Sequence, residues 1–160
     1  MGAGVLPIAF HNGKVYMLIG KENHSGGWSD FGGGREKDES LYETAIREGV
    51  EELNGFFGGE TILRNKIKNN SITVLETKEP VYKCYLFKVD YDKNLPEYFN
   101  QNFKLMKKRL PSVVEKHNGL FEKSEVRWVT LSELKKMKMR KFFYLAVYPL
   151  LNNFLSNYSV

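Results

Sequence analysis

Three glutamates with helical spacing are the residues of this sequence best placed to act together on one ligand. Glu48, Glu51 and Glu52 are related by i, i+3 and i, i+4, so on a helix their side chains fall within one arc of about 100°. Like charges repel at this spacing, and a bound cation would relieve the repulsion. Hard carboxylate oxygens favour Mg²⁺ or Mn²⁺. The spacing predicts a divalent-metal site, although a solvated acidic helix face would have the same spacing.

A single helix is expected to carry these three glutamates. Ser40 and Glu43 have the spacing of a capping box, and Asn54-Gly55 tolerates the left-handed conformation that ends helices, so we expect a helix from Ser40 to Asn54. Gly49 within it suggests close packing on a strand. The side opposite the glutamates is apolar and is expected to face the core through Tyr42, Ile46, Val50 and Leu53.

A longer pattern surrounds the glutamates. Gly33 is followed after five residues by Glu39, and after seven more by the run Arg47 to Glu52. This pattern resembles the box of the Nudix family: a glycine, a glutamate, arginine-glutamate, a small or aliphatic residue, any residue, and two glutamates. The family's box closes with a glycine and an aliphatic residue, where this chain has Asn54 and Gly55. This departure affects the loop after the helix and leaves the metal site intact.

The resemblance implies a fold, an activity and a set of residue roles. The fold class is α/β (α+β), a Nudix α/β/α sandwich with a mixed β-sheet between helices, in a single domain over residues 1–160. The activity is metal-dependent hydrolysis of a diphosphate linkage in a nucleoside diphosphate linked to another moiety, with Mg²⁺ or Mn²⁺ as cofactor. Arg47 would orient Glu48 through a charge-assisted hydrogen bond. The implied metal ligands are Glu48, Glu51, Glu52, the carbonyl of Gly32 and, as a ligand or an orienting group, Glu39.

The general base and the substrate contacts stay open at this level. In the family the base is the first glutamate of the helix, here Glu48, or a glutamate on a later loop, for which Glu122 and Glu125 are the candidates. Two flanking cations could touch phosphate or simply be solvated, and a tryptophan could stack on a base or cover the core. These three residues are Lys21, Arg35 and Trp28.

The box does not choose among substrates. Members of the family hydrolyse nucleoside triphosphates, dinucleoside polyphosphates, ADP-ribose, diphosphoinositol polyphosphates or the cap of messenger RNA. Capped RNA could use a basic surface, although solvated helix faces look the same in sequence. A catalytically silent Nudix-fold binding module is the alternative from another class, and the intact glutamate set argues against it. The basic residues are Lys104, Lys107, Lys108, Arg109, Lys116, Lys135, Lys136, Lys138, Arg140 and Lys141.

The remaining segments predict strands before and after the box, and helices towards the end of the chain. Asn12-Gly13 favours a tight hairpin, and Pro111 and Pro149 are expected to interrupt helices. The expected strands are Val5–Phe10, Val15–Ile19, Ser71–Leu75, Val81–Tyr91 and Val126–Val129, with a long loop over Gly20–Gly34. The expected helices are Leu95–His117, Leu134–Met137 capped by Ser132 or Thr130, and Lys141–Leu155.

Composition sets broad limits. At 160 residues and 42% hydrophobic the chain can bury one core of ordinary size, and its net charge of +5 would favour a polyanionic partner. The single cysteine, Cys84, lies in an apolar stretch and is expected to be buried. No signal or membrane-spanning segment is visible, so we predict an intracellular, cytoplasmic protein, which could form a homodimer. The three histidines lack metal-ligand spacing: His11, His24 and His117.

Overall fold

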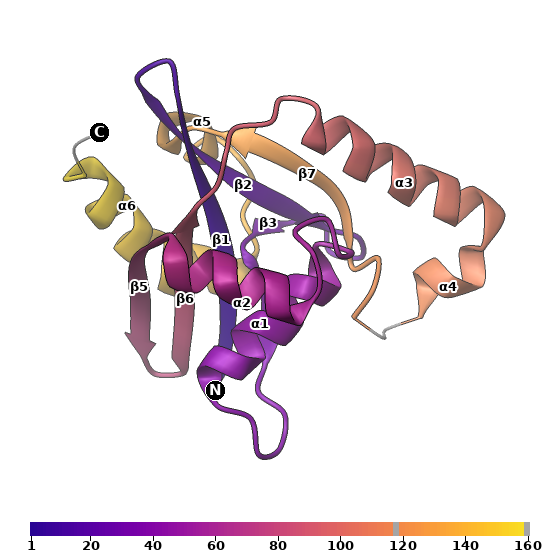
Figure 1. Cartoon of the computed structure of the whole chain (residues 1–160), viewed down its shortest axis with the longest axis horizontal. Coiled ribbons are helices and arrows are strands. Elements are labelled where there is room, and N and C mark those ends of the chain that lie inside the picture. The colour runs from indigo at the N-terminus through magenta and orange to yellow at the C-terminus, as the bar shows by residue number, and fades with distance from the viewer. Residues whose placement is uncertain (117–118, 159–160) are drawn as a thin grey trace.

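A seven-stranded mixed sheet organises the computed structural model, which describes residues 1–116 and 119–158 (Figure 1). The strand order is β3-β2-β1-β6-β5, with β4 also pairing with β1 and β7 with β2. Among the paired strands of the described residues, β1 and β6 run parallel and the other pairs are antiparallel. The strands are β1 Gly2–His11, β2 Lys14–Glu22, β3 Trp28–Ser29, β4 Phe31–Gly34, β5 Ser71–Lys78, β6 Val81–Lys88 and β7 Lys123–Val129.

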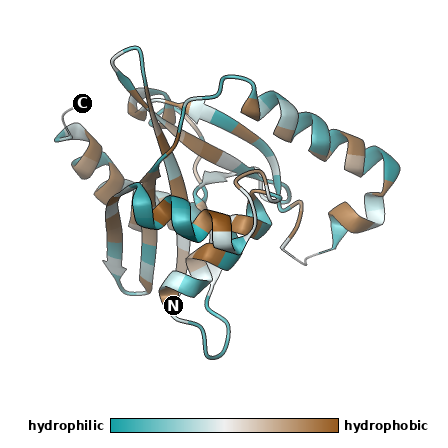
Figure 2. Ribbon diagram, in the orientation of Figure 1, coloured by the Kyte–Doolittle hydropathy of each residue, from teal (hydrophilic) through white to brown (hydrophobic). Residues whose placement is uncertain are grey.

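Helices cover both faces of the sheet. In β1, Val5 and Ala9 join the core cluster under α1 and α2, whereas Leu6 and Ile8 join the cluster under the C-terminal helices. Figure 1 shows α1 and α2 in front of the sheet, and Figure 2 shows hydrophobic and hydrophilic bands on the covering helices. The expected α/β/α sandwich is confirmed. The helices are α1 Leu41–Glu52, α2 Glu60–Asn69, α3 Leu95–Arg109, α4 Pro111–Glu115, α5 Leu131–Leu134, the π-helix η1 Phe143–Val147 and α6 Tyr148–Ser156.

The first hairpin forms as expected. His11 pairs with Lys14 across the turn, and Asn12 and Gly13 both have positive φ, at 50° and 73°. Two central residues in the left-handed region match the twist of the flanking strands. The buried middle of this hairpin forms the centre of the sheet.

The expected long loop over Gly20–Gly34 is wrong at both ends. Strand β2 continues to Glu22, and Phe31–Gly34 pairs with the start of β1 as β4. A Cβ atom on Gly32 would lie 2.6 Å from the Cα of Gly4, so glycines on both strands permit this close pairing. Glycine has no side chain to show strand alternation, and the glycine run therefore hid a strand.

Several other boundaries differ from expectation. Helix α2 was missed, because it is largely polar and buries only Leu63 and Ile67. Strand β6 ends at Lys88, and α5 begins just after Thr130, whose side chain forms the capping box with Glu133. The last helix begins at residue 141, as expected, and includes the π-helix η1 before Pro149. His117 lies outside the described residues.

No helix in the described part of the chain is both long enough and apolar enough to cross a membrane. Cys84 is buried, as expected.

Candidate active site

Helix α1 begins and packs as its sequence predicts. The Ser40 hydroxyl accepts a hydrogen bond from the Glu43 N–H at 3.1 Å, and the Glu43 carboxylate accepts one from the Ser40 N–H at 2.8 Å. A Cβ atom on Gly49 would lie 2.9 Å from side-chain carbons of both Val5 and Leu63. Glycine thus lets α1 approach β1 and α2 closely, and this packing fixes the direction in which the opposite face points.

The opposite face of α1 borders a polar cavity of about 420 Å³, here called the acidic cavity. Glu48 and Glu52 are 9% and 2% exposed, and the side chain of Glu51 is 31% exposed. The Gly32 N–H donates to Glu52 Oε2 at 2.9 Å, which joins β4 to the helix. The cavity is lined by Glu22, Gly32, Gly33, Gly34, Glu36, Arg47, Glu48, Glu51, Glu52, Gly119, Glu122 and Arg140.

Burial makes ionisation of these carboxyl groups unfavourable. Loss of hydration raises the pKa of Glu48 and of Glu51, and it raises that of Glu52 well above its ordinary value. Arg47 opposes the rise at Glu48 and Glu51, and Lys123 opposes it at Glu52. A cation in the cavity would stabilise the ionised forms.

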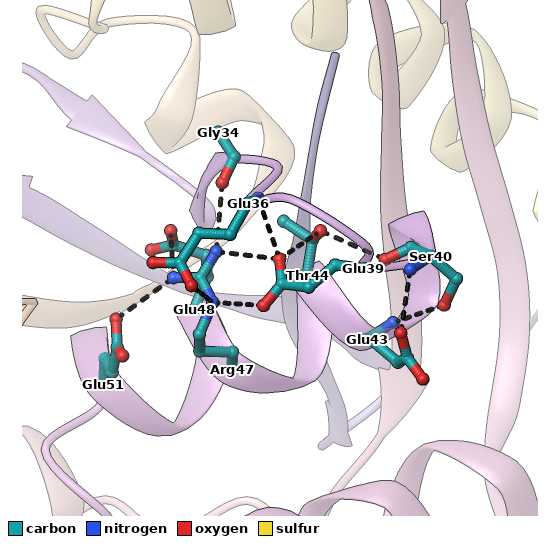
Figure 3. Close-up of polar contacts among 9 residues, drawn as sticks. All are labelled: Gly34, Glu36, Glu39, Ser40, Glu43, Thr44, Arg47, Glu48 and Glu51. Carbon is teal, nitrogen blue, oxygen red and sulfur yellow. Dashed lines mark hydrogen bonds and ion pairs between the residues drawn. The ribbon is translucent and has the colours of Figure 1, made fainter.

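Arg47 links the start of the box to its glutamates (Figure 3). Its Nε donates to Glu39 Oε1 at 2.6 Å, one terminal nitrogen donates to Glu48 Oε1 at 2.8 Å, and the other donates to the Gly34 carbonyl at 3.0 Å. Glu51 Oε2 lies 3.4 Å from the same nitrogen that contacts Glu48. The hydrogen bond from Arg47 lowers the pKa of Glu39 to about 2. Glu39 is therefore ionised at neutral pH, and its carboxylate holds the Arg47 guanidinium in place.

The donor chemistry of the cavity fits Mg²⁺ or Mn²⁺. It offers hard carboxylate oxygens and peptide groups of a glycine strand, and the lining residues that the structure describes include no sulfur or imidazole. Within residues 1–116 and 119–158, no three Asp, Glu, His or Cys side chains already surround one ion position. The metal roles of Glu48, Glu51, Glu52, Gly32 and Glu39 stay predictions.

The two glutamates outside the box that were considered as the base lie in different places. Glu122 borders the acidic cavity, and its charge is among those that raise the pKa of Glu48 and Glu51, after the larger effect of burial. Glu125 pairs with Lys21 in the register of β7 and β2, forms an ion pair with Arg127 at 3.1 Å, and does not border the cavity. Glu122 therefore lies at the cavity and Glu125 does not, and a role as general base stays a prediction for both.

The three predicted substrate contacts also lie outside the lining of the acidic cavity. Trp28 is 6% exposed and belongs to the core, with the Arg127 guanidinium 4.9 Å from the ring centroid. Lys21 is partly buried on β2, and Arg35 is exposed just after β4. Contact with a substrate stays a prediction for all three. For Trp28 the sequence left two positions open, over a base or over the core, and the structure shows Trp28 in the core.

Two basic residues at the site were missed. Lys123 is fully buried, and its Nζ donates to Ser29 Oγ at 2.7 Å and Glu22 Oε1 at 2.8 Å. The same nitrogen lies 3.6 Å from Glu52 Oε2. Arg140, which the sequence placed only in a basic stretch, borders the acidic cavity 3.6 Å from Glu22. Neither has a local sequence signal, since their partners are distant in the chain.

A second cavity of about 220 Å³, here called the adjoining pocket, shares Arg140 and the Gly32 to Gly34 strand with the acidic cavity. Asp30 is 6% exposed on its wall, and the Tyr82 hydroxyl donates to Asp30 Oδ2 at 2.8 Å. Burial raises the pKa of Asp30. The two cavities together could hold a charged group beside a more apolar one.

Comparison with known proteins gives the family. A protein-family model described as the NUDIX domain matches residues 1–151 of this chain. Curated proteins give no match. An Ap4A hydrolase from C. elegans, in a binary complex, aligns with a TM-score of 0.59 at 17% identity, covering 98% of this chain and 96% of that one. A Nudix hydrolase from M. smegmatis, RenU, gives 0.58 at 13%, covering 99% and 88%.

A third solved structure is the NUDIX domain of NrtR from Shewanella oneidensis, complexed with ADP ribose. It aligns with a TM-score of 0.53 at 14% identity, covering 95% of this chain and 85% of that chain. Likeness at these identities shows the fold, and the domain model covers nearly all of the chain. The chain therefore belongs to the Nudix family and is a hydrolase of pyrophosphate bonds.

Proposed function

We propose that this Nudix hydrolase cleaves, with a divalent metal, the diphosphate linkage of a nucleoside diphosphate joined to another moiety. The acidic cavity carries the proposal, because three carboxyl groups with raised pKa face it beside a glycine strand. Dinucleoside polyphosphates and ADP-ribose are the first substrates to test. One similar structure is an Ap4A hydrolase, and another binds ADP ribose.

The residues of the acidic cavity have different roles in this proposal. Mg²⁺ or Mn²⁺ held by Glu48, Glu51 and Glu52 would neutralise charge on the diphosphate and acidify a bound water. Arg47 orients the Glu48 carboxylate by donating a hydrogen bond to it. Arg140 contacts phosphate from the wall that both cavities share.

Glu122 is the general base in this proposal, and Glu48 is the alternative. Glu48 already accepts a hydrogen bond from Arg47, whereas the carboxylate of Glu122 borders the cavity from another segment. Loss of a general base typically lowers kcat by about 10²- to 10⁴-fold. Glu122→Gln should fall in that range and still bind metal, and Glu125→Gln should keep normal turnover. Full activity in Glu122→Gln would assign the base elsewhere.

The adjoining pocket is the proposed binding site of the nucleoside. It offers the rings of Tyr82 and Phe142 and the buried carboxyl group of Asp30, within reach of a diphosphate in the acidic cavity. Pockets that combine apolar walls with a few placed polar groups suit such ligands. Phe142→Ala should raise KM for a nucleotide substrate more than it lowers kcat.

The test is a hydrolysis panel in ¹⁸O-labelled water with Mg²⁺ or Mn²⁺, with products identified by mass. The panel holds nucleoside triphosphates, Ap4A, ADP-ribose, a diphosphoinositol polyphosphate and cap-labelled RNA. We expect metal-dependent cleavage of a nucleotide, loss of turnover in Glu52→Gln, and normal turnover in Glu60→Gln, a change of an exposed glutamate on α2. The labelled product identifies the attacked phosphorus.

Two other outcomes of the panel would change the assignment. Cleavage of long capped RNA but not of free cap would favour decapping and give a role to the exposed lysines of α3, Lys104, Lys107 and Lys108. Binding of a nucleotide without turnover, with metal present, would indicate a silent binding module.

A further inference from the structure

The loop that carries Glu122 is tied to the end of the box helix. The Phe121 N–H donates to Asn54 Oδ1 at 3.0 Å, across 67 positions of sequence. Asn54 follows Leu53, the C-cap of α1, and it stands where the family's box closes with glycine. On the same loop Gly119 lies so close to Glu51 that a side chain there would collide with the carboxylate. The Asn54 side chain thus joins the end of α1 to the loop that carries Glu122.

The same loop is fixed from its other side. The Asn23 N–H donates to the Glu122 carbonyl at 2.8 Å, and the next residue, Lys123, is anchored inside the protein by Ser29. Phe121 is 9% exposed and packs in a small cluster with residues of α3 and α4. Glu122 therefore stands between two backbone hydrogen bonds, and the one on its N-terminal side depends on Asn54.

Asn54 has two local costs. Its φ is +49°, in the region where a side chain is unfavourable and glycine is not. Its Nδ2 is buried and has no hydrogen-bond partner among the described residues, so its loss of hydration is not compensated there. Glycine would remove both costs. The feature that asparagine supplies and glycine lacks is the Oδ1 acceptor for Phe121.

We propose that Asn54 is a positioning residue that holds Glu122 over the acidic cavity. The inference rests on the proposed function in one respect, because the Glu122 carboxylate acts on a diphosphate bound there. Asn54 is not among the residues that line the acidic cavity. It acts through the backbone of Phe121, and its loss leaves the glutamates of α1 in place.

The first test is amide hydrogen exchange at Phe121, which needs no substrate. Asn54→Gly removes the acceptor and suits the positive φ, so the fold is kept. It should accelerate exchange of the Phe121 amide at least about tenfold, as expected when a hydrogen bond in a locally stable segment is lost. Asn54→Asp keeps an acceptor oxygen and should retain most of the protection. Asn12→Gly is the matched control, since Asn12 has φ +50° in the distant hairpin turn. Unchanged exchange in Asn54→Gly overturns the proposal.

The second test is kinetic. Asn54→Gly should lower kcat roughly tenfold with KM within about twofold, because small displacements of a reacting group are costly. The double variant Asn54→Gly/Glu122→Gln should be no slower than Glu122→Gln alone, since two residues that act through one another are not additive. Additive losses, or a change confined to KM, would contradict the positioning role. A wild-type protein inactive on every substrate would refute the proposed function instead, and amide exchange would then decide the role of Asn54.

Discussion

The three glutamates of the box have the same side chain but very different surroundings. Glu48 is held by Arg47, Glu51 is the most open, and Glu52 lies under the site between the Gly32 N–H and Lys123. The sequence predicted their common face from spacing alone. It could not predict their burial, because burial depends on β4 and β7, which meet the helix only in the folded chain.

Lys123 compensates charge beneath the cavity. Its ammonium is fully buried against Glu22, Ser29 and Glu52, and the charges of Glu52 and Glu22 raise its pKa in spite of burial. Removing one partner of a buried ion pair typically costs about 3–5 kcal/mol. Lys123→Met should lower the free energy of unfolding by about 3 kcal/mol in urea titrations, whereas Lys135→Met, an exposed change, should alter it little. Equal stabilities of the two variants would refute this role.

Glu39 links stability to pH. Its pKa is lowered from an ordinary 4.5 to about 2, chiefly by the hydrogen bond from Arg47. Because the folded-state pKa is the lower one, the stabilisation is complete above about pH 4.5 and is lost as pH falls towards 2. Glu39→Gln should cost about 1 kcal/mol at pH 6, after allowance for solvent screening, and close to nothing near pH 2. Urea titrations of both proteins across this range check it, and a constant difference would contradict it.

At the scale of elements, patterns with strong local signals were predictable. The capping box placed the start of α1, and Asn12-Gly13 placed the first turn. Elements whose signal comes from elsewhere were not: β4 is a glycine run that forms a strand because β1 pairs with it, and α2 is polar around most of its surface. Tertiary pairing supplied what the local sequence lacked.

Gly49 shows how one position sets the distance between elements. Alanine there would place Cβ 2.9 Å from carbons of Val5 and Leu63, so steric strain should outweigh its better helix propensity. We expect Gly49→Ala to destabilise by about 1 kcal/mol, observed as a thermal midpoint lowered by about 2–4 °C. Gly34→Ala is the control, because its Cβ would meet open space. A midpoint that rises in Gly49→Ala would show that the contact relaxes freely.

At the scale of the whole molecule, the site is assembled from segments far apart in sequence. The sheet brings the glycine strand, the box helix, the loop before β7 and Arg140 around one cavity. The Nudix box predicted the helix and the glycine that opens the box, Gly33, since both lie within one short motif. The positions of Lys123 and Glu122 required the pairing of β7 with β2, which places residues 101 to 103 positions apart in contact. Arg140 is placed instead by the hydrogen bond from its backbone N–H to the carbonyl of Trp28 in β3.

Metal binding should therefore stabilise the whole fold, since the folded chain alone assembles these segments. A ligand at 100 times its dissociation constant adds about 2.7 kcal/mol to the free energy of unfolding. For a chain of this size that corresponds to a rise of about 5–10 °C in the thermal midpoint. Saturating Mn²⁺ should produce such a rise in wild type and in Glu60→Gln, and a much smaller one in Glu52→Gln, whose carboxylate lies deepest in the site. Equal rises in all three would place the bound ion outside the acidic cavity.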